Sequence, residues 1–151
     1  MNKFIKLKNE QDYLDFASKT NGLHDGYIIS ADYRKHVIVE YNHYVHTMPN
    51  LTLKILVTSM IGHPVVELKF SGVRDMRLHG GFSDIFGFTM KWGTTNNLLR
   101  EPYVQWCTER EFDWEKHSME TDPNTTYVIA CDAEWRFTGE SYDADNTKEL
   151  Q

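Results

Sequence analysis

The pattern of hydrophobic and polar positions begins with a helical period. An apolar stripe at helical spacing is formed by Tyr13, Leu14, Phe16 and Ala17. Asn9 is placed to accept hydrogen bonds from the first free amides of a helix, and Gly22 is placed to end it in a left-handed conformation. These signals predict one N-terminal helix over about residues 10–20.

After the helix the period changes to two, which is typical of β-strands. Residues 27–33 and 37–41 are rich in aromatic and β-branched side chains, and the polar pair Arg34-Lys35 between them predicts the turn of a hairpin. Residues 51–57 and 66–71 alternate regularly, with a turn predicted at Gly62-His63-Pro64. The alternation slips at Gly72, which predicts a β-bulge or bend.

The second half of the chain continues in the same way. Residues 85–92 are predicted to form a strand, and residues 96–102 a loop. Residues 103–117 are compatible with strands interrupted near Glu109 and Arg110, and a helix beginning at Pro102 is the alternative. In residues 126–137 one face is predicted to carry Tyr127, Ile129, Cys131, Ala133, Trp135 and Phe137.

Together these elements predict an α+β fold that is mostly β. One N-terminal helix packs on a strongly twisted antiparallel sheet, or on a partly open barrel, of about seven to nine strands. We expect a single domain over residues 1–138 and a polar, acidic tail over residues 139–151, since the chain contains no internal repeat and no linker.

Charge and cysteine content exclude several classes of function. The 16 basic and 22 acidic residues give a net charge of −6 with no basic run, so binding to nucleic acid or to an anionic membrane is not expected. The two cysteines are too few for a disulfide scaffold and are expected to be small buried side chains. No secretory signal and no membrane-spanning apolar run follow the N-terminus, which predicts a cytoplasmic protein.

Candidate chemistry centres on His24 and Asp25, between the predicted helix and the first strand. An imidazole beside a carboxylate suits a general base with its orienting partner. Adjacent residues of an extended chain point to opposite faces, however, so a structural role in a turn is favoured. If this site binds a ligand, His79 is the third candidate residue.

Other catalytic or metal-binding motifs are absent from the sequence. There is no HxH, HExxH or CxxC pattern, no nucleophile elbow and no phosphate-binding loop, so we expect no metal, no cofactor and no catalytic residues. His43 and His46 are three residues apart, a spacing that would place them on opposite faces of a strand.

One charge pattern suggests a binding surface. Four acidic residues share strand parity, namely Glu109, Glu111, Asp113 and Glu115. They are interpreted either as an ordinary solvated face or as an acidic docking surface for a basic protein.

The segment Leu23-His24-Asp25-Gly26 and the strand after it resemble small bacterial domains, some of which are classed as polymorphic-toxin immunity proteins. Those domains also have an N-terminal helix, then Phe/Leu-His-Asp, then a β-meander. The stretch Glu67-Leu68-Lys69-Phe70-Ser71-Gly72-Val73 is similar to one of their strands. The resemblance implies a non-enzymatic binder whose acidic surface blocks a toxin.

The sequence therefore favours a non-catalytic protein-binding domain, immunity-like in type. The first alternative is a small-molecule or carbohydrate binder, or an unrecognised enzyme, that uses aromatic and histidine side chains in a concave sheet. A structural or homo-oligomeric module is the second alternative.

Overall fold

The structure is a computed structural model that describes residues 2–78, 85, 87–93, 103–108 and 125–142. Helix α1 (Glu10–Lys19) is followed by a short 3₁₀ turn, Asn21–Leu23. The strands are β1 (Ile5–Lys6), β2 (Gly26–Val39), β3 (Val45–Val57), β4 (Pro64–Arg77), β5 (Thr89–Gly93), β6 (Tyr103–Cys107) and β7 (Tyr127–Ser141).

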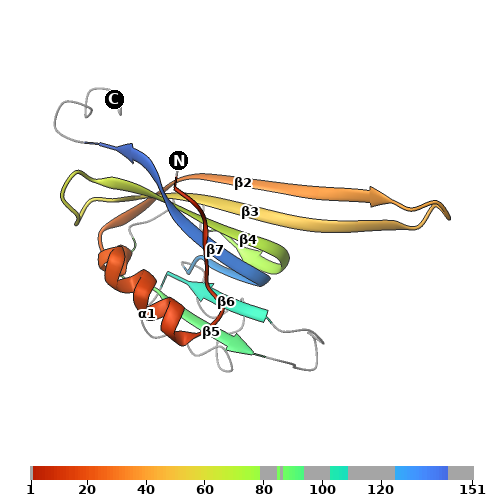
Figure 1. The fold of residues 1–151 in the computed structure, drawn as a ribbon, viewed down its shortest axis with the longest axis horizontal. Coiled ribbons are helices and arrows are strands. Elements are labelled where there is room, and N and C mark those ends of the chain that lie inside the picture. The colour runs from red at the N-terminus through yellow and green to blue at the C-terminus, as the bar shows by residue number, and fades with distance from the viewer. Residues whose placement is uncertain (1, 79–84, 86, 94–102, 109–124, 143–151) are drawn as a thin grey trace.

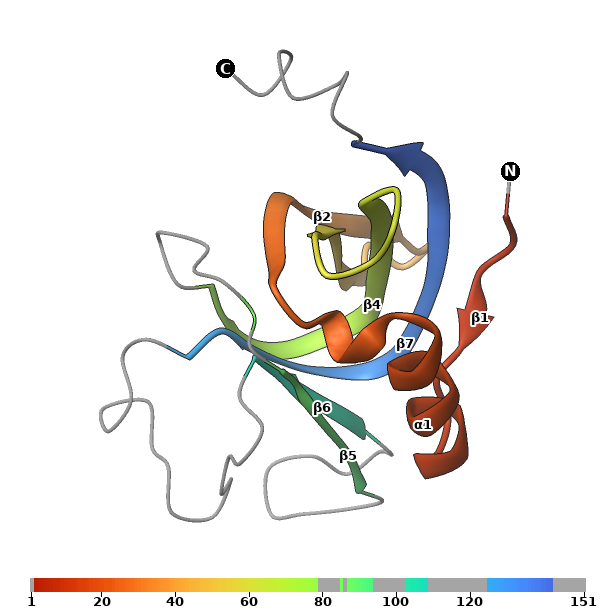
Figure 2. The same ribbon diagram turned by 90° about the vertical axis from the view of Figure 1, so that its left-hand side faces the viewer.

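All described strands belong to one antiparallel sheet of seven strands (Figure 1). Its order is β2-β3-β4-β7-β6-β5, and β1 pairs with the C-terminal half of β7. The path ends at β2 on one side and β5 on the other, so the sheet is open rather than a closed barrel. Figure 2 shows that the sheet is strongly curved and that α1 lies beside β7. The predicted α+β, mostly β class is confirmed.

The helix forms where the local signals place it. The Asn9 side chain accepts a hydrogen bond from the Asp12 amide at 3.0 Å, and Gly22 has φ of 62° just after the helix ends. Phe16 is fully buried, and its ring lies 4.8 Å from that of Trp135 on β7. The helix therefore covers the apolar face of the sheet.

The core is built from the alternating positions of β3 and β4. Leu53 pairs with Leu68 and Leu51 pairs with Phe70, and all four side chains are fully buried. The bend predicted at Gly72 is confirmed, since this residue has φ of 65° and the β4–β7 register shifts between Val73 and Asp75.

Two predictions about the strands are wrong. Arg34-Lys35 do not form a turn, because β2 continues through them to Val39 and pairs with β3 along its whole length. The predicted alternation of β7 holds from Ala133 onward. Before it Tyr127 is buried as predicted, but so are Val128 and Ala130 of the opposite face. The strand changes its buried face beside Gly72, where the backbone twists.

Other elements differ in their limits. The strand predicted over residues 85–92 is β5, which begins at Thr89, while Ile85 forms only an isolated bridge with Gly26. Residues 103–107 are the strand β6 rather than a helix. Strand β7 continues past residue 138 to Ser141.

Candidate functional site

The most unusual feature of the structure is a two-stranded ribbon that leaves the sheet. Strand β3 pairs with β4 only from Asn50 to Leu56, whereas its pairing with β2 continues out to Val39 opposite Val45. Residues 34–49 therefore form a hairpin with no third strand among the described residues. We call these residues the arm, and Figure 1 shows it extending far from the rest of the molecule, which we call the body.

The tip of the arm is a tight turn with its own hydrogen bonds. The amide of Glu40 donates to the Tyr44 carbonyl at 2.8 Å, and the Asn42 side chain accepts from the Tyr44 amide at 3.1 Å. His43 takes the left-handed conformation at φ of 66°. His46 and Glu40 lie 3.0 Å apart across the hairpin. These contacts define the turn and hold the two strands in register.

The arm exposes an unusual amount of apolar surface. Seven large hydrophobic side chains are between 52% and 104% exposed, namely Val37, Ile38, Val39, Tyr41, Tyr44, Val45 and Met48. Val37 and Val39 lie on the face of the ribbon that continues the buried face of β3. Ile38 and Met48 lie on the opposite face. An isolated hairpin is only marginally stable in water, and exposed apolar surface on this scale typically marks an interaction site.

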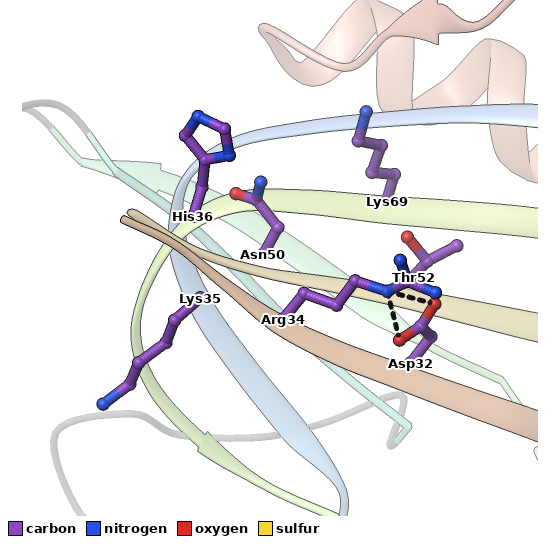
Figure 3. Close-up of a pocket in the computed structure, with 7 residues that line it drawn as sticks. All are labelled: Asp32, Arg34, Lys35, His36, Asn50, Thr52 and Lys69. Atoms are coloured by element: carbon purple, nitrogen blue, oxygen red, sulfur yellow. Dashed lines mark hydrogen bonds and ion pairs between the residues drawn. The ribbon is translucent and has the colours of Figure 1, made fainter. Parts of the chain in front are cut away.

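The base of the arm is polar. A depression of about 350 Å³ is lined by Asp32, Arg34, Lys35, His36, Asn50, Thr52 and Lys69 (Figure 3). The Arg34 guanidinium donates to the Asp32 carboxylate at 3.0 Å, and this hydrogen bond and charge raise the pKa of Arg34. Lys69 lies 3.7 Å from Glu134. Figure 3 shows Lys35 directed away from His36 and Asn50, so the cations spread over a surface rather than converge on one point.

The charge of the arm differs from that of the body. Arg34 and Lys35 outnumber Glu40, so the arm carries a formal +1 and the rest of the chain carries −7 out of the total of −6. The arm is therefore repelled less by another acidic surface than the rest of the chain taken together.

The predicted site residues fall into two groups. Glu109, Glu111, Asp113, Glu115 and His79 lie outside the described residues.

His24 and Asp25 are described. Their side chains approach to 3.7 Å, contrary to the expectation that they point apart, because Asp25 has φ of 53° and the chain turns there. Both are about half exposed, and the Asp25 carbonyl accepts a hydrogen bond from the Thr58 hydroxyl at 2.7 Å. This hydrogen bond fits the structural role in a turn.

Two other depressions occur in the described part. His24 borders one of about 250 Å³ beside Tyr13 and Phe88. A larger one, of about 450 Å³, lies between β1, β5, β6 and β7 and is lined in part by Lys8, Trp92, Tyr103 and Asp132. The two do not share a lining residue, so the aromatic groove and the His24–Asp25 pair are separate features.

Within the described ranges, no three His, Cys, Asp or Glu side chains gather into a group that could hold a metal ion. Of the two cysteines, Cys107 is buried as predicted and Cys131 is half-buried. No described helix has the length and apolar character needed to cross a membrane. No protein-family model matches the chain, and neither the curated proteins nor the solved structures contain a significant match.

The arm was missed by reasoning from the sequence. The residue pattern predicts its strands, but the polar pair Arg34-Lys35 wrongly predicts a turn between them. The observed turn, residues 41–43, carries the better signal, since Asn42 favours the side-chain hydrogen bonds of tight turns.

Proposed function

We propose that the protein is a non-catalytic protein-binding domain and that the arm is its binding element. The observation that carries this proposal is the set of seven exposed hydrophobic side chains on a hairpin that pairs with no other described strand. A half-exposed large side chain leaves on the order of 100 Å² uncovered. The arm thus offers several hundred Å², a size typical of interaction surfaces.

The shape of the arm favours a protein as the ligand. A projecting ribbon has two faces and two edges but encloses no cavity, so it suits an extended partner better than a small molecule. Another polypeptide can pair with the exposed backbone groups of the strand edges and cover the valine side chains at the same time. Backbone pairing and burial of the valine side chains both favour a protein partner that offers a β-strand.

A finer proposal concerns the kind of partner. The resemblance of the segments around His24 and Lys69 to immunity domains supports a role in blocking a toxin. In that case the acidic residues Glu109, Glu111, Asp113 and Glu115 would add a second contact with a basic partner. The charge of −7 outside the arm supports such a second contact with a basic partner.

Photo-crosslinking from the tip of the arm tests the proposal. Tyr41 and Ile61 are both 104% exposed, but Ile61 lies in the β3–β4 turn at the far end of the sheet (Figure 1). A photoreactive residue at Tyr41, in cells that produce the protein, is expected to give discrete polypeptide adducts, and one at Ile61 is not. Threonine at Val37 and Val39 should weaken the Tyr41 adducts. Equal labelling from both positions would contradict the proposal.

A second candidate is a carbohydrate or small-molecule binder. It is favoured by one observation, the 450 Å³ groove in which Trp92 and Tyr103 lie beside the charged Lys8 and Asp132. Aromatic faces with nearby charged groups suit the binding of sugars. Saturable changes in tryptophan fluorescence on titration with oligosaccharides, lost in Trp92→Phe, would support it.

A further inference from the structure

We propose that the arm binds a second copy of this chain, with β2 of one arm pairing antiparallel with β2 of the other about a two-fold axis at Val37. This proposal rests on the proposed function, because it identifies the partner of the same surface. It also gives that interface a register.

The first support is the free edge of β2. This strand is the terminal one of the sheet, and among the described residues its outer edge makes only the bridge from Gly26 to Ile85. The residues from Ile28 to Val39 are therefore a long edge strand that no described strand pairs on its outer side. Long, apolar edges of this kind are templates for pairing with another strand. An identical strand pairs with this edge in closed two-fold symmetry.

The second support is the order of charges along β2 and at Glu40, the residue that follows it. Antiparallel pairing about Val37 places Arg34 opposite Glu40 of the second copy, and by symmetry the same pair forms again on the other side. Val37 then faces its own copy, and Tyr33 lies beside the turn that begins at Tyr41 in the second copy. Opposite charges at directly paired positions stabilise a sheet, and like charges destabilise it.

Neighbouring registers are less suitable. An axis at His36 places Asp32 opposite Glu40, and an axis at Lys35 places two lysines opposite each other. An axis at Tyr33 does match charges, since Asp32 then faces Arg34, but it leaves Tyr41 and the tip of the arm without a partner strand. The axis at Val37 alone among these pairs opposite charges and also covers the arm to its tip.

The third support is the position of the arm relative to the charge of the body. Two bodies that each carry −7 repel one another at short range. Antiparallel pairing of the arms puts the bodies at opposite ends of the paired region. From Tyr33 to Val39 the strand spans about 20 Å at 3.3 Å per residue, which exceeds the Debye length of about 8 Å at physiological ionic strength. The dimer therefore avoids the main electrostatic cost.

The test measures the mass of the whole protein in solution by sedimentation equilibrium. The wild type is expected as a dimer of twice 17.7 kDa. Arg34→Glu and Glu40→Arg each place like charges opposite one another at two symmetric positions, so each should weaken dimerisation roughly tenfold or more. The double variant R34E/E40R restores the attraction and should dimerise nearly as well as the wild type. Both positions lie on the exposed arm, and unchanged circular dichroism will verify that the variants fold.

The outcomes separate this proposal from the proposed function. A monomeric wild type overturns the second copy as partner, and so does a double variant that stays as weak as the single ones. Adducts from Tyr41 to a different protein would then leave the arm as a binding element. Adducts that join Tyr41 to a peptide around Tyr33 of the same sequence, together with rescue by the double variant, support the dimer.

Discussion

Removal of the arm is expected to leave the body folded. In this variant an Asn-Gly pair replaces residues 35–49 and joins Arg34 to Asn50, which are paired across the hairpin. Asn-Gly suits a two-residue hairpin turn, so the strands can close where the sheet ends. The deletion removes the large exposed hydrophobic side chains of the arm and no residue of the main buried cluster.

The magnitude follows from these contacts. Exposed substitutions usually change the free energy of unfolding by no more than about 0.5 kcal/mol. The free energy of forming an isolated two-stranded ribbon in water is close to zero. Shortening the connection changes the loop entropy by only about 1–2 kcal/mol, in the stabilising direction. We therefore expect the truncated protein to lose less than about 1 kcal/mol of stability relative to the full chain.

The assay is urea unfolding followed by tryptophan fluorescence at low protein concentration, where association does not contribute to stability. All four tryptophans lie outside the arm, so the signal is retained. Leu51→Ala is the control, because Leu51 lies in the same strand, just beyond the arm, and is fully buried. It should cost about 2–5 kcal/mol. If the truncation costs as much as this control, the arm contributes to the core and the reasoning about its exposure is refuted.

Two further predictions concern the body. Gly72→Ala should lower the melting temperature more than Gly139→Ala: both glycines have positive φ, but an added Cβ would lie 2.9 Å from the Cys131 sulfur at residue 72 and would meet nothing within 4 Å at residue 139. Equal losses would contradict this. Burial, reinforced by the charge of Asp75, raises the pKa of Tyr127 above its ordinary value of 10.0. The stability that this shift contributes is therefore present below pH 10 and is lost as the pH rises through the raised pKa. Tyr127→Phe should therefore flatten the decline in unfolding free energy above pH 10, measured from urea midpoints, and parallel curves would contradict it.

The parts of the fold that could be predicted from the sequence are those fixed by local chemistry or by burial on one face. The helix limits follow from Asn9 and Gly22, whose cap and left-handed conformation are determined by their immediate neighbours. Strands β3 and β4 follow from alternation, because Leu53 and Leu68 lie on the buried face and their neighbours do not. In these regions helix capping or strand alternation, read from neighbouring residues, is enough to predict the structure.

The errors occur where long-range geometry decides. The buried face of β7 changes between Ala130 and Ala133, opposite Gly72 on β4, so the signal for the change lies on another strand. Similarly, the approach of His24 to Asp25 depends on a backbone turn that places Asp25 at positive φ. The hydrophobic pattern of a single segment therefore predicts neither the change of buried face in β7 nor the turn at Asp25.

The sequence pattern does not predict the arm for a related reason, which also supports its proposed function. Periodicity predicts strands through burial, and a ribbon that leaves the sheet has no core to bury its side chains, so polar Arg34-Lys35 can lie in mid-strand at little cost. The same absence of a core leaves the valines of the arm unexplained by the fold of a single copy. Folding of one chain requires no apolar side chains at Val37, Val39 and Val45, because each is more than half exposed there. Their cost in exposed apolar surface is offset only when a second surface covers them, so the deviation from the sequence rule and the proposed binding site occur at the same residues.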